Sequence, residues 1–456
     1  MNTGKELAVA KMRAAHVNQT AIAIFEHYWD QLRSGATGMI PEDTIWPLSD
    51  PDTIEDFTDA HASDEDREAL AATAIIKLNG GLGTSMGLDK AKTLLTVKDG
   101  LTFLDLIVRQ VQWARKHFGV RLPLVFLHSF STRADVLAAL EAYPGLAVAG
   151  LPLDMMQSEE PKLLQSDLTP VSWPPNPKLE WCPPGHGDLY PTLLDSGILD
   201  SLLDKGFKYA SVSNSDNLGA SPSAVLAGWF ARSGAPFATE ITKRTPMDVK
   251  GGHIARRKSD GRLILRESAQ TPPEEMVYFT DPAIHPYAHC NNLWFDLAAL
   301  KAKLDQTGGV LGLPLIRNAK TVDPTDPTSP AVVQIESAMG AAIESFEGAR
   351  AIAVPRSRFL PVKTTNELTL LRSDIVTLGE DFIPRATVWP LPVVTLSKPY
   401  STIAGLDERI PYPLGLREAR TLTVTANWYF GEDVQVIGDV ELGGDGGVIP
   451  DDTTLM

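Results

Sequence analysis

The chain has 456 residues, a formal net charge of −16 and two cysteines, Cys182 and Cys290. This length exceeds the usual size of one hydrophobic core, so we expect two or three domains. The acidic balance argues against nucleic acid as a partner, and two cysteines argue against a disulfide framework and favour buried thiols.

The first 70 residues predict an N-terminal helical region. Residues 5–33 place apolar side chains at helical spacing. Residues 50–66 are rich in carboxylates, whose loose spacing favours a solvated acidic connector over a metal site. The chain has no apolar stretch long enough to span a bilayer, and its first residues lack a secretory-signal pattern, so we expect no membrane partner and a cytoplasmic location.

Residues 71–95 carry the most informative pattern in the chain. An apolar run at residues 74–76 predicts a buried strand, which leads into a loop with four glycines between residues 80 and 87, then Lys90 and Lys92. Such a loop exposes backbone N–H groups to an anion, and lysines add positive charge. The spacing fits neither a P-loop nor the dinucleotide-binding fingerprint. We predict another kind of phosphate- or nucleotide-binding loop, over the alternative of a glycine-rich surface turn.

The next segments alternate between helix and strand patterns. Thr102 is placed to cap a helix over 103–117, and apolar runs predict strands over 122–127 and 146–151. Thr132 and Asp135 resemble the start of another helix. This alternation predicts a parallel sheet with helices on its faces, where ligands bind at the carboxyl ends of the strands.

Polar residues follow several of these strands. Gln157 offers an amide that suits a uracil edge, although a surface glutamine is the alternative. His186 lies in the stiff segment Pro183-Pro-Gly-His-Gly-Asp188, which favours a ligand contact and a structural histidine about equally. Asp216, at the end of a strand, suits Mg²⁺ bound with phosphates, and an Asn/Asp turn before a helix at Ser221 is compatible with that role.

Residues 235–300 read as shorter strands of a mixed or antiparallel extension. Glu267 and Asn291 lie at strand ends, where they either bind sugar hydroxyls or are ordinary polar residues. A helix is expected from residue 337 to about 348 and a strand over 350–355. Three cations follow, Arg356, Arg358 and Lys363, for which phosphate contacts and salt bridges are the two interpretations.

From residue 386 onward, prolines become frequent and short β segments alternate with Gly and Asp at near-regular steps. That pattern is typical of stacked coils in a β-solenoid.

These motifs, taken in order, resemble those of eukaryotic-type UTP–glucose-1-phosphate uridylyltransferases, also called UDP-glucose pyrophosphorylases. The most specific match is Lys77-Leu-Asn-Gly-Gly-Leu-Gly-Thr-Ser-Met-Gly87 with Lys92 after it. Further matching segments are 123–130, 183–188, 212–220, 248–252, 291–294, 318–321 and 354–365. The resemblance therefore covers about residues 75 to 370.

The resemblance implies an α/β fold with two parts after the N-terminal region at residues 1–70. Residues 71–385 would form a Rossmann-like nucleotidyltransferase domain with a mixed, mostly parallel sheet. Residues 386–456 would form a left-handed parallel β-helix, through which a homo-oligomer is one implied assembly. The implied reaction makes UDP-glucose and pyrophosphate from UTP and glucose 1-phosphate with Mg²⁺.

The resemblance also implies roles for individual residues. Lys92 and Lys363 would be the catalytic lysines, and Asp216 would hold the metal. The nucleotide-binding residues would be Leu78, Asn79, Gly80, Gly81, Lys92, Gln157, Gly185, Asn214, Asp216 and Lys363. His186 would touch the sugar phosphate. We expect Gly252, Glu267 and Asn291 to belong to the same sugar phosphate-binding site.

Two positions depart from the family pattern. Asp89 replaces a cation, for which Lys90 is the nearest compensation, and His128 stands where Asn is usual. The sequence leaves two rival functions open. One is a related pyrophosphorylase that uses galactose 1-phosphate or N-acetylglucosamine 1-phosphate, and the other is a non-catalytic UTP-binding homologue.

Overall fold

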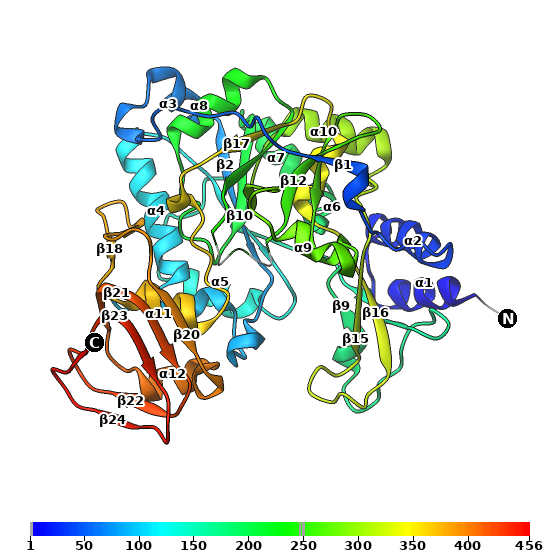
Figure 1. The fold of residues 1–456 in the computed structure, drawn as a ribbon. Helices are drawn as coiled ribbons and strands as arrows, with labels where there is room; N and C mark the ends of the chain where they lie inside the picture. The colour runs from blue at the N-terminus through cyan, green and yellow to red at the C-terminus, as the bar shows by residue number, and fades with distance from the viewer. Residues whose placement is uncertain (1–2, 246–247, 249–250) are drawn as a thin grey trace.

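A seven-stranded sheet runs through the middle of the molecule (Figure 1). The structure is a computed structural model that describes residues 3–245, 248 and 251–456. Across the central sheet the strands are β17 (Arg350–Ala353), β11 (Phe237–Lys243), β14 (Tyr287–Asp296), β10 (Tyr209–Asn214), β2 (Thr73–Asn79), β5 (Leu124–His128) and β6 (Asp154–Met156).

The central sheet is mixed and mostly parallel, as predicted. β10, β2, β5 and β6 pair in parallel, and so do β11 and β17. β14 is antiparallel to both of its neighbours, so it runs against the other strands. The carboxyl ends of the parallel strands therefore meet along one edge, which is where ligands bind in sheets of this kind.

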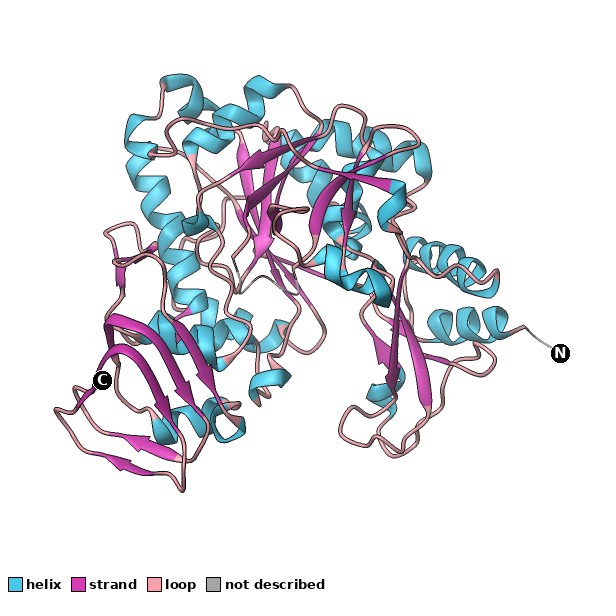
Figure 2. Cartoon of the chain, viewed as in Figure 1, coloured by secondary structure: helices cyan, strands magenta, loops and turns pink. Residues whose placement is uncertain are grey.

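Helices cover both faces of this sheet (Figure 2). The helices are α1 (Gly4–Ala14), α2 (Gln19–Arg33), α3 (Asp64–Ala71), α4 (Phe103–Phe118), α5 (Arg133–Leu140), α6 (Leu189–Asp195), α7 (Ile198–Asp204), α8 (Ala224–Ser233), α9 (Met276–Phe279), α10 (Leu297–Thr307), α11 (Thr365–Arg372) and α12 (Ile403–Arg409). Short 3₁₀ helices near the site are η3 (Thr84–Met86), η4 (Lys92–Leu94), η6 (His186–Asp188), η9 (Met339–Ser345) and η10 (Arg356–Arg358).

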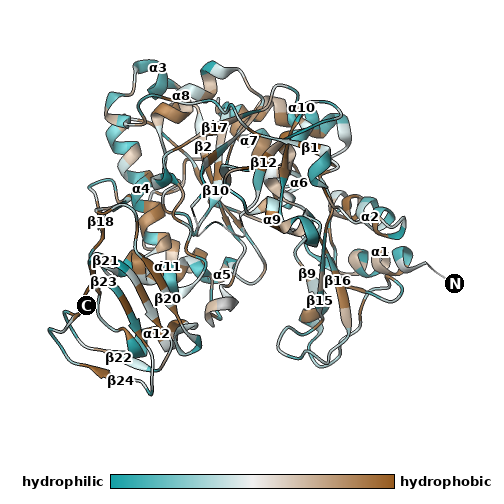
Figure 3. Ribbon diagram, in the orientation of Figure 1, coloured by the Kyte–Doolittle hydropathy of each residue, from teal (hydrophilic) through white to brown (hydrophobic). Residues whose placement is uncertain are grey.

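Alternate residues of the central strands enter two different cores. Ile75 packs with α4 and α8 in one core, whereas Ile76 packs with α6, α7 and α10 in the other. Strand side chains point to opposite faces in turn, so a strand that is apolar throughout is buried on both sides. The strands of the central sheet accordingly carry much apolar sequence, while the outer helix α3 is largely hydrophilic (Figure 3).

Smaller sheets flank the central one. They are β1 (Ile45–Pro47) with β12 (His253–Arg257) and β13 (Leu263–Arg266), β8 (Leu163–Leu164) with β15 (Ile316–Thr321) and β16 (Ala331–Glu336), β3 (Thr96–Lys98) with β4 (Leu101–Thr102), β7 (Glu160–Pro161) with β9 (Trp181–Cys182), and β18 (Val376–Leu378) with β19 (Pro384–Ala386). A third core joins α1 and α2 to β8 and β16.

Strands β20 to β25 form two sheets in which every pair of neighbouring strands is parallel. One sheet consists of β20 (Val393–Leu396), β21 (Gly415–Val424), β23 (Gln435–Leu442) and β25 (Thr454–Leu455), and the other of β22 (Trp428–Phe430) and β24 (Gly447–Ile449). This is the pairing that stacked coils make. The handedness of the winding stays a prediction.

Several sequence-based boundaries are wrong. The expected N-terminal helix is two helices, because Asn18 caps the second by accepting from the backbone N–H of Ala21. Residues 146–151 form turns, and the strand that pairs with β5 comes later, at β6. An apolar run can be buried in turns as well as in a strand, and Leu146 and Leu151 are buried this way.

Three further expectations need correction or completion. The acidic connector ends earlier than residue 66, because Ser63 caps α3 there. The helix expected from residue 337 is the 3₁₀ helix η9. One of the shorter strands in residues 235–300 is expected at Lys250-Gly-Gly-His-Ile254. The strand there, β12, starts at His253, and Lys250 lies outside the described residues. Both cysteines are buried and free, as expected.

None of the helices in the described part of the chain is long and apolar enough to cross a lipid bilayer.

Candidate functional site

Four predicted site residues lie at the carboxyl ends of the central parallel strands. Leu78 of β2 pairs with Asn214 of β10, and Asn79 pairs with His128 of β5. The backbone N–H of Gln157, which follows β6, donates to the His128 carbonyl at 2.8 Å. The register of the sheet therefore aligns the glycine-rich loop, the 214–217 turn and the Gln157 loop along one edge.

The glycine-rich loop turns back on itself directly after β2. Gly83 has φ 67° in the left-handed region, and a Cβ there would lie 2.9 Å from the Leu88 side chain. The Lys92 backbone N–H donates to the Gly81 carbonyl at 3.2 Å, which closes the loop. Only glycine adopts this conformation at little cost, so the spacing of glycines brings Lys92 back to the sheet edge.

Hydroxyl and imidazole groups fix the start of this loop. Thr132 donates to the Asn79 carbonyl at 2.7 Å, and Ser129 donates to the Gly80 carbonyl at 2.8 Å. The Asn79 carboxamide lies between Thr93, which donates to its oxygen, and His128 Nδ1. These contacts orient the backbone and side chain of Asn79 before any ligand is bound.

Lys92 lies against Asp216 and against the backbone of Val362, the residue before Lys363. Lys92 Nζ lies 2.7 Å from Asp216 Oδ2 and also contacts the Val362 carbonyl. The Val362 backbone N–H in turn donates to the Asp216 carbonyl at 3.4 Å. Lys363 follows Val362 and its side chain is exposed. Two cations and one carboxylate thus share the carboxyl edge of the sheet.

Gln157 lies against the glycine-rich loop. A Cβ on Gly80 would be 3.1 Å from the Gln157 carboxamide oxygen, so the glycine leaves room for this amide. The next residue, Ser158, donates its backbone N–H to Asp188 at 2.6 Å. Asp188 therefore ties the Gln157 loop to the segment that carries Gly185 and His186. Burial raises the pKa of Asp188 to about 7.

Gly185 and His186 are held against Ser337 and against the start of η9. Gly185 has φ 79° and ψ 177°, and a Cβ there would lie 2.5 Å from the Ser337 carbonyl oxygen. The Met339 backbone N–H donates to His186 Nδ1 at 2.9 Å. Burial lowers the pKa of His186 to about 4, so the ring is neutral at pH 7 and carries its hydrogen on Nε2. His186 is then a directed hydrogen-bond donor.

Glu267 and Gly252 form the other side of the site. A Cβ on Gly252 would be 2.8 Å from Glu267 Oε2, so the carboxylate lies over this glycine. Burial raises the pKa of Glu267, and the positive charge of Lys363 opposes that shift, so Glu267 lies near Lys363. His289 donates its backbone N–H to the Gly252 carbonyl at 2.8 Å and packs against Gly340 of η9.

Asn291 has two features that indicate a functional constraint. Its φ is 54°, in the left-handed region that non-glycine residues rarely adopt, and it lies where the register of β11 and β14 shifts. Its Oδ1 is buried and has no hydrogen-bond partner among the described residues. Strained backbone and an unpartnered buried acceptor concentrate at ligand sites.

Two of the three cations after β17 form ion pairs inside the protein. Arg356 contacts both carboxylate oxygens of Asp248, at 2.6 and 3.0 Å. Arg358 contacts both carboxylate oxygens of Glu240, at 2.8 and 2.9 Å. The salt-bridge interpretation is therefore correct for these two residues, and Lys363 is the exposed cation of the three.

Asp188 and Asn217 lie within the matching motifs, but the sequence predicts no role for either residue. Asp188 holds the Gln157 loop, and Asn217 binds the chain before Lys363. Neither contact is visible in spacing, because the partners are 30 and 143 residues away. The available signal was position, since each lies within two residues of a predicted ligand contact.

The residues present suit a magnesium ion that arrives with a nucleotide. In the described residues no group of three or more His, Cys, Asp or Glu side chains is arranged to hold a metal. Mg²⁺ held together with phosphates needs only one or two protein carboxylates, because phosphate oxygens and water complete its shell. Asp216, a partly exposed carboxylate beside Lys92, fits that donor set.

Residues 22–436 match the family model described as UTP–glucose-1-phosphate uridylyltransferase. The enzyme of that name from Saccharomyces cerevisiae is 36% identical over 86% of this chain and 77% of its own length. The Solanum tuberosum enzyme is 35% identical over 91% of this chain and 84% of its own length.

Solved structures agree over the whole chain. UDP-glucose pyrophosphorylase from Leishmania major, described in open and closed forms, superposes with a TM-score of 0.93 at 40% identity and covers 100% of this chain and 98% of its own. A mutant of that enzyme in complex with UDP-glucose has a TM-score of 0.92 at 39% identity, with the same coverage. The chain therefore belongs to the UTP–glucose-1-phosphate uridylyltransferase family.

Proposed function

We propose that this chain joins UTP and glucose 1-phosphate to give UDP-glucose and pyrophosphate. The observation that carries the proposal is the contact of Lys92 with Asp216 and with the carbonyl before Lys363, at the carboxyl edge of the central sheet. One nucleotide's phosphate chain can meet all three side chains there. Membership of the uridylyltransferase family supports the same reaction.

In the proposed reaction an oxygen of the sugar phosphate attacks the α-phosphorus of UTP, and the bond from that phosphorus to the bridging oxygen of pyrophosphate breaks. The attacking oxygen is already ionised at neutral pH, so no nucleophilic side chain is needed. Lys92 and Lys363 reduce the repulsion between the two polyanions and stabilise the charge on the departing pyrophosphate. Asp216 would hold Mg²⁺, which supplies further positive charge to the phosphates.

The remaining residues bind and orient the two substrates. Leu78, Asn79, Gly80 and Gly81 would line the nucleotide, and Asn214 would bind ribose or phosphate. Gln157 and Gly185 would meet the uracil edge, to which a carboxamide can both donate and accept. Nε2–H of His186 would donate to the sugar phosphate, because Nδ1 already accepts from Met339. Gly252, Glu267 and Asn291 would surround the sugar.

We also propose the finer organisation that the family implies. Residues 1–70 would be a helical extension, 71–385 the catalytic domain and 386–456 a left-handed parallel β-helix through which copies of the chain assemble. The parallel pairing of β21 with β23 and of β22 with β24 supports stacked coils. A cytoplasmic location remains a prediction of the sequence.

Pyrophosphate release with UTP, Mg²⁺ and glucose 1-phosphate tests the function. Wild-type protein should turn over, and Lys363→Ala or Asp216→Ala should lower kcat by about 100-fold or more, as loss of a transition-state contact does. Lys301→Ala is the matched control, because Lys301 lies on α10 and pairs with Asp305. Wild-type turnover by either site variant would contradict the assigned roles.

The same assay separates the rival functions. A panel with galactose 1-phosphate and N-acetylglucosamine 1-phosphate should show glucose 1-phosphate with the highest kcat/KM. A higher value for another sugar would assign the related pyrophosphorylase activity. Tight UTP binding without pyrophosphate release from any sugar phosphate would indicate a non-catalytic homologue.

A further inference from the structure

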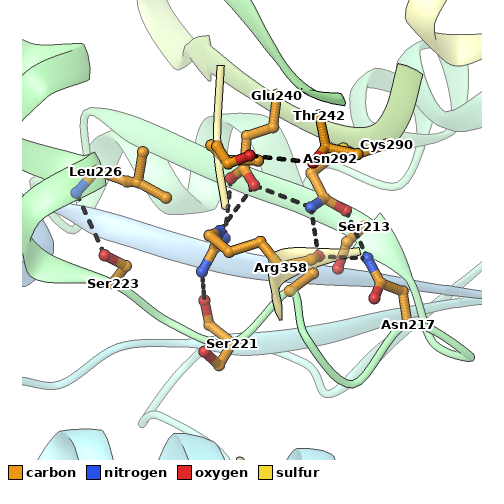
Figure 4. Close-up of polar contacts among 12 residues, drawn as sticks. Ser213, Asn217, Ser221, Ser223, Leu226, Glu240, Thr242, Cys290, Asn292 and Arg358 are labelled. Atoms are coloured by element: carbon orange, nitrogen blue, oxygen red, sulfur yellow. Dashed lines mark hydrogen bonds and ion pairs between the residues drawn. The ribbon is translucent and has the colours of Figure 1, made fainter. Parts of the chain in front are cut away.

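A buried polar network lies behind the candidate site (Figure 4). Its centre is Glu240 of β11, whose side chain is fully buried. Arg358 contacts both oxygens of this carboxylate, and its third nitrogen donates to the Ser221 carbonyl at 3.1 Å. Trp294 donates to the same carboxylate at 2.9 Å. The ion pair is thus enclosed and hydrogen-bonded, so breaking either partner would leave a buried charge.

Two carboxamides connect this ion pair to the backbone that leads to Lys363. Asn292 donates to Glu240 at 2.9 Å and to the Arg358 carbonyl at 3.3 Å. Asn217 donates to the Arg358 carbonyl at 3.0 Å and to Asn292 Oδ1 at 3.1 Å. Asn217 Oδ1 also accepts the Leu360 backbone N–H at 2.9 Å. One side chain therefore binds the chain at residues 358 and 360.

Asn217 is placed between the two halves of the catalytic arrangement. It follows Asp216 directly, and its backbone pairs with Pro361. The next residue on that segment, Val362, contacts the Asp216 backbone and accepts from Lys92. The carboxamide of Asn217 thus sets the spacing between the Asp216 turn and the segment that presents Lys363, and it does so from a buried position.

We propose that Asn217, supported by Asn292 and the Glu240–Arg358 pair, is a positioning residue that holds residues 358–363 in register with Asp216, so that Lys363 meets the phosphates of the bound nucleotide. This inference rests on the proposed function for the role of Lys363. It assigns no substrate contact to Asn217, because both polar atoms of its side chain make hydrogen bonds within the network. Its effect on catalysis passes through the backbone.

Hydrogen exchange tests the positioning without any catalytic assay. Asn217→Ala and the isosteric Asn217→Asp should speed exchange of the backbone amides of Leu360, Val362 and Lys363 by about tenfold or more. The first variant loses every side-chain contact of Asn217, and the second places an oxygen against the Arg358 carbonyl. Thr242→Val is the matched control: it removes one buried hydrogen bond, to the Val354 carbonyl, and should leave these amides unchanged. Unchanged exchange in both Asn217 variants would overturn the proposal.

A double-mutant cycle tests whether the effect passes through Lys363. Asn217→Asp alone should lower kcat at least about tenfold with KM for UTP within about threefold, whereas in a Lys363→Ala background it should lower kcat by less than threefold. If the fold decreases in kcat of the two single variants multiplied in the double variant, Asn217 would act independently of Lys363 and the proposal would be overturned. Failure of the wild-type assay would instead count against the proposed function, and the exchange result would still decide the positioning.

Discussion

At the scale of single residues, the three cations after β17 differ in whether a carboxylate of the protein neutralises them. Arg356 and Arg358 lie within a few residues of Lys363, and all three follow a strand end. The arginines are neutralised by Asp248 and Glu240, which come from distant segments, while Lys363 is exposed. A planar guanidinium matches a carboxylate in two contacts, whereas an ammonium group is a point charge suited to phosphate.

Gly185→Ala should damage the site through its backbone. The new Cβ would meet the Ser337 carbonyl at 2.5 Å in a conformation that side-chain-bearing residues avoid, which costs on the order of 1–3 kcal/mol in strain alone. We expect a KM for UTP raised about tenfold and a lower unfolding midpoint. Gly197→Ala is the control, because φ there is 72° and no atom lies within 4 Å of the new Cβ. A wild-type KM for UTP in Gly185→Ala would show that Gly185 does not belong to the nucleotide site.

Asp188→Asn should change the pH dependence of stability. Burial raises the pKa of Asp188 from 3.8 to about 7, so the folded state binds its proton more tightly than the unfolded state. The resulting stabilisation is complete below about pH 3.8 and is lost as pH rises through 7, by up to about 1.4 kcal/mol per unit. Relative to Asp188→Asn, the wild type should therefore lose stability between about pH 4 and about pH 7.

Urea unfolding at several pH values measures this difference. An asparagine oxygen can still accept from Ser158 and Thr192, so the loop should stay closed. The exposed Asp204→Asn is the control and should run parallel to the wild type. If the difference in free energy of unfolding between wild type and Asp188→Asn did not change with pH, burial would not raise the pKa of Asp188.

At the scale of elements, local signals were reliable where one residue type decides the backbone. α4 begins where Thr102 was expected to cap it, and Thr102 and Asp105 form a reciprocal capping box. Thr132 gave a similar signal, but its hydroxyl donates to the Asn79 carbonyl and makes no cap at α5. The same local pattern therefore caps a helix at Thr102, whereas at Thr132 it binds the backbone at the start of the glycine-rich loop.

Thr102→Ala should lower the free energy of unfolding by about 1 kcal/mol, because the Asp105 backbone N–H loses its acceptor. The Asp105 carboxylate, which accepts from the Thr102 backbone N–H, also loses the hydroxyl that orients it. Urea denaturation measures the change. Thr96→Ala, at an exposed strand position nearby, should stay within about 0.5 kcal/mol of the wild type. Equal stability of the two variants would mean that the cap contributes nothing to α4.

At the scale of the whole molecule, the catalytic and C-terminal parts share apolar packing. One cluster of buried residues runs from Ile75 in β2 through Leu371 in α11 to Leu422 and Val436 in the C-terminal strands. The glycine-rich loop also touches this part, since a Cβ on Gly87 would lie 3.0 Å from the Thr402 side chain. Because this core is continuous, we expect the two parts to unfold together.

Leu422→Ala should therefore destabilise the entire chain, by about 2–5 kcal/mol, because it leaves a cavity at a fully buried position. Tryptophan fluorescence and far-UV circular dichroism should report one urea transition shifted to lower concentration. Val448→Ala, at a position that is 72% exposed, should shift it little. A separate early transition in Leu422→Ala would show that the C-terminal part unfolds alone.

The sequence by itself determined the glycine-rich loop, the family and the order of the elements. A buried strand followed by four glycines and Lys92 predicts an anion-binding loop, and the alternation after it predicts a mostly parallel sheet, because periodicity and glycine conformation are local properties. Only the tertiary structure decided which charges are paired inside the protein. Lys92 reaches Asp216 and the carbonyl before Lys363 through strand register and loop closure, and Glu240 and Asp248 neutralise the two arginines from distant segments. Such long-range pairing depends on the packed fold and leaves no trace in spacing along the chain.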